Sequence, residues 1–194
     1  MHSKSNRFKV GFVVRATPFF GGKTYFRTAP AKFTSGTSSF SALFSDDIIA
    51  NIDTFRVKSF QTFAVNVRVV LQYAISNKLE VGFNIDVAGK TWGSTVTGNL
   101  ISKRNKRTFQ DGSLASSSNP ETWNLLLISD SDIGSLNSEI YARYWITNKI
   151  GIRAGASFQF VEITTEKKVE INGSLNDTWR YKTLMPLGAI SYKF

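Results

Sequence analysis

Apolar and polar residues alternate along most of the chain, and this alternation predicts antiparallel β-strands. From Arg7 to Thr17 every second residue is apolar, and the same period of two continues through 60–75 and 79–88. Aromatic residues, which favour strands, are frequent, with 16 Phe, 6 Tyr and 4 Trp. No long segment has the spacing of an amphipathic helix. We therefore expect an all-β protein.

Two short turns with similar sequences join neighbouring strands. The segment at 73–83, YAISNKLEVGF, resembles the segment at 144–154, YWITNKIGIRA, and both turn at a Ser/Thr-Asn-Lys tripeptide. The first turn predicts a hairpin centred on 76–78. The second predicts a hairpin with strands at 136–146 and 150–163.

Turn length also predicts which residues of the first hairpin face each other. If Ile75 lies opposite Leu79, then Arg68 lies opposite Asp86 on the polar face. Buried charges must be paired, so we expect these two side chains to form an ion pair in the interior of the sheet.

The same register in the second hairpin sets two arginines directly opposite each other, Arg143 and Arg153, and sets Trp145 over Gly151. Two guanidinium groups at that separation repel, so carboxylates must bridge them. The polar faces supply the members of an interior charge network: Arg15, Arg68, Glu80, Asp86, Glu139, Arg143 and Arg153.

The other connections are much longer than the turns. A last strand is expected over 178–194, whereas 18–59 and 91–135 are long segments rich in Ser, Thr, Gly, Asn and charged residues. If the strands run alternately up and down, the short turns lie at one end and the long segments at the other. We expect one end to be compact and the other to display loops.

The alternation leaves open whether the apolar face points into a soluble, lipocalin-like barrel or out into lipid. Lipid is favoured because about five alternating apolar positions per strand match the height of a hydrocarbon layer. The opposite face mixes Gly and Ala with charged and amide residues, which suits a crowded interior. Aromatic residues gather near the short-turn ends, where an interfacial belt is expected: Phe8, Tyr73, Tyr144, Tyr192 and Phe194.

Composition narrows the choice of class. The chain has 194 residues, 42% hydrophobic and 20% charged residues and a net charge of +10, which is incompatible with a disordered protein. No run reaches the roughly 18 apolar residues that a membrane helix needs. There is no Cys and one His, His2, so disulfides, thiolate metal sites and catalysis by a positioned imidazole are not expected. The segment 1–6 has no apolar stretch typical of a signal peptide and is expected to be disordered or added.

Over most of its length the pattern resembles the small outer-membrane β-barrel proteins of Gram-negative bacteria, the class that includes OmpX and the membrane domain of OmpA. The most specific element is the C-terminal strand, where Ile190, Tyr192 and Phe194 resemble the signal recognised by the barrel-assembly machinery. Gly188 departs from that signal, because it stands four residues before Tyr192 where three are usual. Ser-Asn-Lys turns and long polar loops are similar to those of outer-membrane proteins of Bacteroidetes.

The resemblance implies a single domain over 1–194: a closed antiparallel up-and-down transmembrane barrel of eight strands, with short periplasmic turns and long extracellular loops. Six strands are clear in the pattern. The missing pair is placed at 94–102 and 122–129, in preference to 24–34 and 40–52. Six strands with two structured loops would leave an incomplete barrel that needs a partner edge.

We expect no enzymatic activity and no cofactor. Enzymes among such barrels use His with Ser or acidic residues, and the carboxylates at 46–47 and 130–132 lack the spacing of a Ca²⁺ loop. No metal is therefore expected. The densest basic run is a candidate contact for anionic lipid or an acidic partner, or else a solvated loop; its charged members are Lys103, Arg104, Lys106 and Arg107.

These features favour a non-enzymatic protein of the outer membrane, acting as a surface-binding protein or an accessory subunit of an envelope complex. The alternatives are a small pore or transporter, and a soluble lipocalin-like barrel that binds a ligand. Expected partners are outer-membrane lipid and lipopolysaccharide, the barrel-assembly machinery and other envelope proteins. Nucleic acid is not expected, because an outward apolar band contradicts it.

Overall fold

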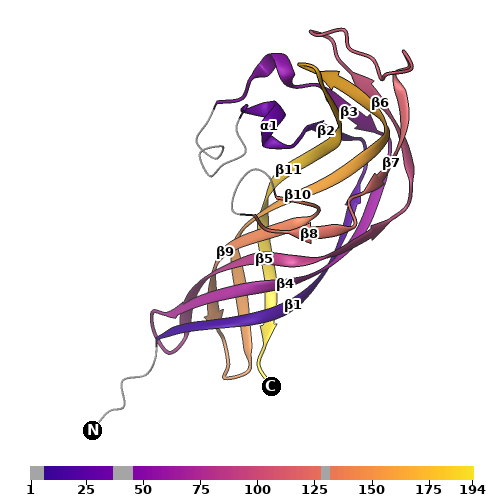
Figure 1. Cartoon of the computed structure of the whole chain (residues 1–194). Coiled ribbons are helices and arrows are strands. Elements are labelled where there is room, and N and C mark those ends of the chain that lie inside the picture. Colours follow the sequence, from indigo (N-terminus) through magenta and orange to yellow (C-terminus); the bar gives the residue numbers. More distant parts are fainter. Residues whose placement is uncertain (1–6, 37–45, 128–131) are drawn as a thin grey trace.

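The computed structural model describes residues 7–36, 46–127 and 132–194, and its strands form one antiparallel sheet that curls on itself (Figure 1). The expected N-terminal segment 1–6 and the residues Asp130 and Ser131 lie outside the described residues. The long strands are β1 (Phe8–Gly21), β4 (Phe60–Ala74), β5 (Leu79–Gly93), β9 (Leu136–Trp145), β10 (Ile150–Ile171) and β11 (Ser174–Tyr192).

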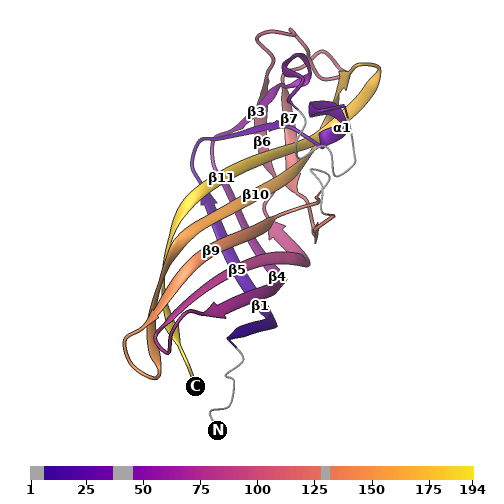
Figure 2. The same cartoon turned by 90° about the vertical axis from the view of Figure 1, so that its left-hand side faces the viewer.

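Short elements occupy the end of the sheet away from the two tight turns (Figures 1 and 2). They are β2 (Thr24–Thr28), α1 (Ala31–Thr34), η2 (Ile49–Asn51), β3 (Thr54–Val57), β6 (Val96–Ile101), β7 (Ala115–Pro120) and β8 (Trp123–Leu125). None of the helices in the described part of the chain is long and apolar enough to cross a membrane.

Both predicted tight turns are confirmed. In the first, the amide of Ile75 donates to the carbonyl of Leu79 at 2.9 Å, and in the second the amide of Ile146 donates to the carbonyl of Ile150 at 2.9 Å. The start of β1 and the end of β11 lie at this same end of the molecule (Figures 1 and 2).

A third hairpin was not predicted and extends the last two strands. β10 runs to Ile171 and β11 starts at Ser174, and the turn between them uses Asn172 and Gly173 with φ of 50° and 73°. Asn-Gly is the strongest short-range hairpin signal, because both residues tolerate positive φ at low steric cost.

The expectation of a closed eight-stranded barrel is wrong in strand number and in closure. The sheet has 11 strands and is not evenly closed. β1 pairs with β4 alone, and the chain then bends and continues as β2, which reaches β11 only through the pairs Trp179/Thr28 and Arg180/Arg27. We call the stretch between β1 and β11 below this contact, where neither strand has a ladder partner on that side, the seam (8–20 and 184–192).

Each of the two long segments expected as display loops instead contributes short strands to the sheet. β6 and β8 lie within the preferred strand positions 94–102 and 122–129, and β2 lies within 24–34. The 40–52 segment contains η2, and its first residues, like 128 and 129, fall outside the described part of the chain. All of these elements are short, so neither proposed pair supplies two long strands.

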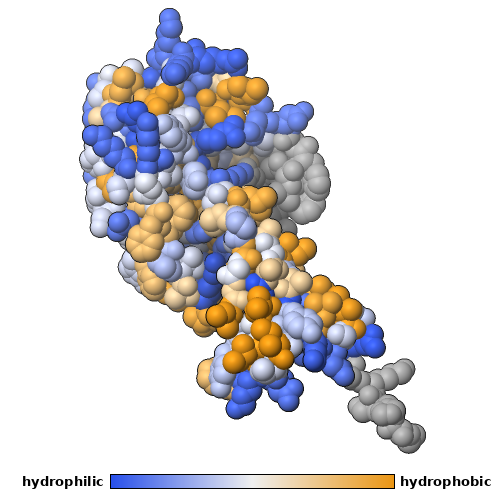
Figure 3. Space-filling view, turned by 180° about the vertical axis from the view of Figure 1, so that it is seen from behind, coloured by the Kyte–Doolittle hydropathy of each residue, from blue (hydrophilic) through white to orange (hydrophobic). Residues whose placement is uncertain are grey.

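The part of the sheet next to the tight turns, which we call the lower half (8–17, 66–86, 138–157 and 184–192), has its apolar face outside. Phe12 is 73% and Ile190 82% exposed, whereas Asp86 is 0% and Glu139 3% exposed on the opposite, concave face. Apolar side chains gather in the lower part of the molecule in Figure 3. The lower half is thus polar inside and apolar outside.

The rest of the sheet with the short elements, which we call the upper half, has the opposite arrangement. Phe26 contacts Phe60 with ring centroids 5.1 Å apart, and Phe55 contacts Trp179 at 5.6 Å. The buried cluster consists of Phe26, Phe33, Phe55, Val57, Phe60, Leu100, Phe109, Val161, Ile163, Val169, Ile171 and Trp179. Packing of this core holds the short strands over the top of the lower half.

Candidate functional site

The charged residues predicted for the interior converge in the lower half. Arg68 lies opposite Asp86, and its Nε donates to Asp86 Oδ1 at 3.0 Å, as the turn register predicts. A second nitrogen, Nη1, donates to Glu139 Oε2 at 3.1 Å. Because Arg68 is buried and touches both acids, it is the centre of the network.

The second hairpin also has the predicted register. Arg143 lies opposite Arg153, and each reaches a carboxylate: Arg143 Nη1 lies 3.2 Å from Glu80 Oε2, and Arg153 Nη2 lies 3.3 Å from Glu139 Oε2. Each arginine therefore has a carboxylate partner, as expected, but the two partners are different acids, so in these ion pairs no single acid bridges Arg143 and Arg153.

Aromatic rings add a second stabilising contact that the pattern did not predict. The guanidinium groups of Arg153 and Arg143 lie 4.6 Å and 5.4 Å from the centre of the Tyr141 ring. Such cation–π contacts lower the cost of placing two like charges together. Trp145 lies over Gly151, as predicted, with a ring carbon about 3.0 Å from where a Cβ would stand.

β1 contributes cations from the other side of the interior. Arg15 approaches both Asp86 Oδ2, at 3.6 Å, and Glu139 Oε1, at 3.4 Å. Lys9, which was not in the predicted network, lies 3.3 Å from Glu80 Oε1. The seven predicted residues and Lys9 thus form two ion-pair clusters, one around Glu80 and one around Asp86 and Glu139. The Tyr141 ring joins them, because it contacts Arg143 of the first and Arg153 of the second. We call the whole set the interior charge network.

Amide side chains hold the acids in place. Asn66 Nδ2 and the Asn137 backbone amide donate to Asp86 Oδ2 at 3.0 Å and 3.1 Å, and Asn84 Nδ2 donates to Glu139 Oε2 at 3.1 Å. Asn66 and Asn84 have the same parity as Arg68 and Asp86 and so share the polar face, but the alternation does not distinguish these amides from ordinary interior polar residues.

Cations outnumber acids in the network, with Lys9 and four arginines against three carboxylates. Within the described residues, three buried arginine nitrogens lack a hydrogen-bond partner: Arg15 Nη1, Arg143 Nε and Arg153 Nε. The site binds its own acids tightly and retains a surplus of positive charge. Clusters of three or more metal-ligating residues are not found in the described parts of the chain.

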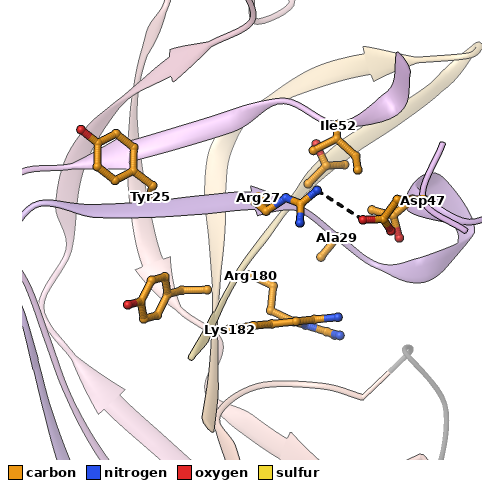
Figure 4. A pocket seen from close by; sticks show the side chains of 10 residues that line it. Tyr25, Arg27, Ala29, Asp47, Ile52, Arg180 and Lys182 are labelled. Carbon is orange, nitrogen blue, oxygen red and sulfur yellow. Dashed lines mark hydrogen bonds and ion pairs between the residues drawn. The ribbon is translucent and has the colours of Figure 1, made fainter. Parts of the chain in front are cut away.

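A separate cavity of about 190 Å³ lies outside the wall where β2 meets β11 (Figure 4). Figure 4 shows Arg27 directed toward Asp47, and their closest atoms are 3.3 Å apart. The remaining lining combines aromatic, basic and small residues: Tyr25, Thr28, Ala29, Thr34, Ile52, Arg180, Tyr181 and Lys182. It is a surface hollow of mixed polar and apolar lining that includes three basic residues, Arg27, Arg180 and Lys182.

Behind this cavity, Arg180 forms a buried ion pair with Glu162, with Arg180 Nη2 and Glu162 Oε2 2.8 Å apart. Burial raises the pKa of Glu162 to about 7, because removal from water outweighs the attraction of Arg180. Glu162 lies in the upper half, above the apolar belt of the lower half.

The predicted basic run is divided by the fold. Arg107 is structural, since its Nη1 donates to Asp53 Oδ2 at 3.0 Å and its Nη2 to the Ala50 carbonyl at 3.1 Å. Lys103, Arg104 and Lys106 are exposed on the upper half. The assembly-signal residues Ile190, Tyr192 and Phe194 are exposed on the apolar face, where Tyr192 and Phe194 stack edge-on at 5.1 Å.

Comparison with protein families, with curated proteins and with solved structures finds no match. Two structural features are therefore the guide to function. One is the reversal of polarity between the two halves, and the other is the interior charge network.

Proposed function

We propose that the protein is a non-enzymatic, integral outer-membrane β-barrel that acts as a surface-binding protein or as an accessory subunit of an envelope complex. Its lower half sits in the bilayer and its upper half stands outside it as a folded platform. The observation that carries the proposal is the lower half, with large apolar residues exposed outside and charged residues buried inside.

This arrangement is unfavourable in water and favourable in lipid. Exposed apolar patches on soluble monomers rarely exceed a few hundred square ångströms, whereas here the outward residues of all six long strands are apolar over most of the lower half. A soluble lipocalin-like barrel would bury those residues, so it does not account for the exposed side chains.

Two belts of exposed aromatic residues match the thickness of a membrane. On β1, Phe8 and Phe20 are both exposed and twelve residues apart. At about 3.3 Å per residue and a tilt of about 45°, they are about 28 Å apart along the membrane normal. The apolar band of an outer-membrane barrel is about 25 Å high. The upper belt consists of Phe20, Phe63, Trp92 and Trp123, and the lower belt is the predicted one.

The filled interior supports a role without conduction. Arg68, Asp86 and Glu139 are buried and bonded to one another across the centre of the lower half. A small barrel has an interior that side chains just fill. A pore or transporter is therefore the weaker alternative.

Binding is proposed for the upper half because it presents a packed surface with exposed basic residues. Lys103, Arg104 and Lys106 lie on it, together with the cavity beside β2 and its three basic residues. Lipopolysaccharide phosphates or an acidic envelope protein are the chemical classes that such a surface attracts.

Detergent dependence and migration in a denaturing gel test the proposal. The purified chain should stay monomeric only in detergent or lipid, and unboiled and boiled samples should migrate differently, because a hydrogen-bonded sheet resists SDS until heated. A monomer that stays soluble without detergent would contradict membrane insertion. Single-channel recording in planar bilayers should show no conductance, and stable conductance steps would favour the pore.

A further inference from the structure

The geometry points to a missing part of the barrel wall: we propose that a β-hairpin of another polypeptide fills the seam between β1 and β11. The inference rests on the proposed membrane insertion. The hairpin brings the wall to eight strands, six long ones from this chain and two from the partner. Its inward face carries carboxylates and its outward face is apolar.

Both edges of the seam present unpaired backbone groups. The amide of Ala74 donates to the carbonyl of Arg7 at 2.8 Å. The backbone N–H and C=O groups of odd-numbered β1 residues therefore bond to β4, and those of even-numbered residues point to the seam. The amide of Lys193 likewise donates to the carbonyl of Lys149 at 2.8 Å, so even-numbered residues of β11 point to the seam. In a bilayer an unsatisfied backbone group is strongly unfavourable, because no water is present to bond it. The edges must therefore find partners.

Direct pairing of β1 with β11 is disfavoured by two prolines. Pro18 and Pro186 are both even-numbered, so their nitrogens, which have no hydrogen to donate, point into the seam. Odd-numbered side chains face inward on both β1 and β11, so in a direct pair odd residues must lie opposite odd ones. Continuing the register of the β2–β11 pairs then requires one extra, bulged residue at 21–23. In that register Pro18 would lie opposite Gly188, and Pro186 would lie opposite Phe20. Two successive hydrogen-bonded pairs of the β1–β11 ladder would then each lack a backbone N–H donor, which weakens that ladder.

Strand direction requires an even number of inserted strands. β1 runs upward from the turn end and β11 runs downward to it, and the strands of the sheet pair antiparallel throughout. A single inserted strand would be parallel to one neighbour, whereas a hairpin is antiparallel to both. Two added strands also give the smallest even count known for such barrels.

Charge in the interior identifies the hairpin's inward face. The interior charge network has two more cations than acids, and Lys9 and Arg15 belong to the seam strand β1. The inward positions of β11 are uncharged: Thr183, Met185, Leu187, Ala189 and Ser191. We therefore place carboxylates on the hairpin strand next to β1 and apolar or small residues on the strand next to β11. A second copy of this chain would add the same positive surplus instead of neutralising it.

The direction of insertion follows from where the seam is sealed. At the top, β2 pairs with β11, and Phe19 and Phe26 contact Tyr181 with ring centroids 6.0 Å and 6.1 Å apart. In both views the lower ends of β1 and β11 lie apart (Figures 1 and 2). The hairpin turn thus points upward, and the rest of the partner lies on the side of the two tight turns.

Exchange of backbone amides with deuterium in the purified, detergent-solubilised chain tests whether the seam is open. The amides of Val10, Phe12 and Val14 should exchange at least about tenfold faster than those of Val13 and Arg15, because only the odd-numbered ones are bonded. Equal protection of both sets would overturn the proposal, since it would mean that β1 pairs with β11.

Pairs of introduced cysteines distinguish a partner hairpin from direct closure of the barrel and from a second copy of the chain. Such pairs are specific because the chain has no cysteine of its own. Ala16→Cys is combined with Gly188→Cys or with Ile190→Cys and oxidised in the membranes of the organism that makes the protein. We expect neither an intramolecular disulfide nor a covalent homodimer. An intramolecular disulfide would mean direct closure and a homodimer a second copy, and either result overturns the proposal.

A photoreactive phenylalanine analogue at Phe12 and, separately, at Ile190 then captures the neighbour in those native membranes. The same heterologous polypeptide should be captured from both edges, through a segment of alternating residues with carboxylates on one face. The analogue at Phe83, on β5 between two strands of this chain, is the control and should give no such adduct. No adduct from either edge, with membrane insertion intact, would contradict the hairpin and leave the proposed function standing.

Discussion

The two halves of this sheet bury opposite kinds of side chain, although single strands run through both. On β10 the same face holds Arg153 in the lower half and Ile163, fully buried, in the upper half. The opposite face presents exposed Ile152 below and buried Glu162 above. Alternation alone therefore fixes which residues share a face, whereas the surroundings of each half decide which face is apolar.

The largest expected effect comes from breaking the polar interior of the lower half. Asp86→Ala should destabilise the protein by about 3–5 kcal/mol, because it leaves buried Arg68 short of one acid and removes the acceptor of two asparagine donors. Adding Arg68→Ala should recover part of this loss. Urea unfolding in detergent micelles measures both changes.

Asp111→Ala is the matched control, because Asp111 is an exposed carboxylate that pairs with Lys167. Exposed pairs contribute about 0–1 kcal/mol. If the double variant were no more stable than Asp86→Ala alone, the argument from an uncompensated buried arginine would be wrong.

The next effect separates the outer faces of the two halves. Phe12→Arg should destabilise insertion by about 2–4 kcal/mol, the cost of an arginine facing lipid near the middle of a barrel. Ile49→Arg places the same charge at an exposed apolar position of the upper half and should change stability by less than about 0.5 kcal/mol. After refolding into vesicles, the fractions of each variant that run as the folded and the unfolded band in a gel give its stability. Equal effects of Phe12→Arg and Ile49→Arg would contradict the distinction between the two halves.

The upper half should depend on pH through Glu162. Its pKa in the folded state is raised to about 7 from an ordinary 4.5, so the folded state binds more protons than the unfolded state between these values. Stability should therefore fall as pH rises from 4.5 to 7, by at most about 1.4 kcal/mol per pH unit. Tryptophan fluorescence of a variant in which Trp92, Trp123 and Trp145 are replaced by Phe, so that buried Trp179 is the remaining tryptophan, follows unfolding of this core.

Glu162→Gln keeps the shape of the side chain and removes its titration. The variant should lose the decline of stability between pH 4.5 and 7. A wild-type slope that persists in the variant would assign the pH dependence to other groups.

Much of the lower half could be predicted from the sequence because local rules determine it. Turn length set the register that pairs Arg68 with Asp86 and Arg143 with Arg153, and period two set the face on which each lies. Buried charges then had to pair with the available acids. Lys9 was missed because its flexible side chain reaches Glu80 across strands that are far apart in sequence.

The upper half could not be predicted in the same way, because its contacts are non-local. Phe55 packs on Trp179, which lies in the predicted last strand, but Phe55 itself comes from β3, which has only four residues and shows no long alternation. One local signal was available and would have helped: Asn172-Gly173 marks the hairpin between β10 and β11. Closure of the barrel depends on the whole sheet, and no local pattern encodes the seam.

The reversal of polarity is tested most directly by attaching a fluorophore to a single introduced cysteine and measuring how strongly the lipid quenches it. The chain has no cysteine of its own, so each label has one position. A nitrobenzoxadiazole group is attached at Ile140, Ile152, Ala189 or Ile49, and the labelled proteins are refolded into vesicles that contain a spin-labelled lipid. Strong quenching is predicted at Ile140 and Ile152, which face outward in the lower half, and little at inward Ala189 or at Ile49 of the upper half. Equal quenching at all four sites, or quenching only at Ala189, would contradict the account.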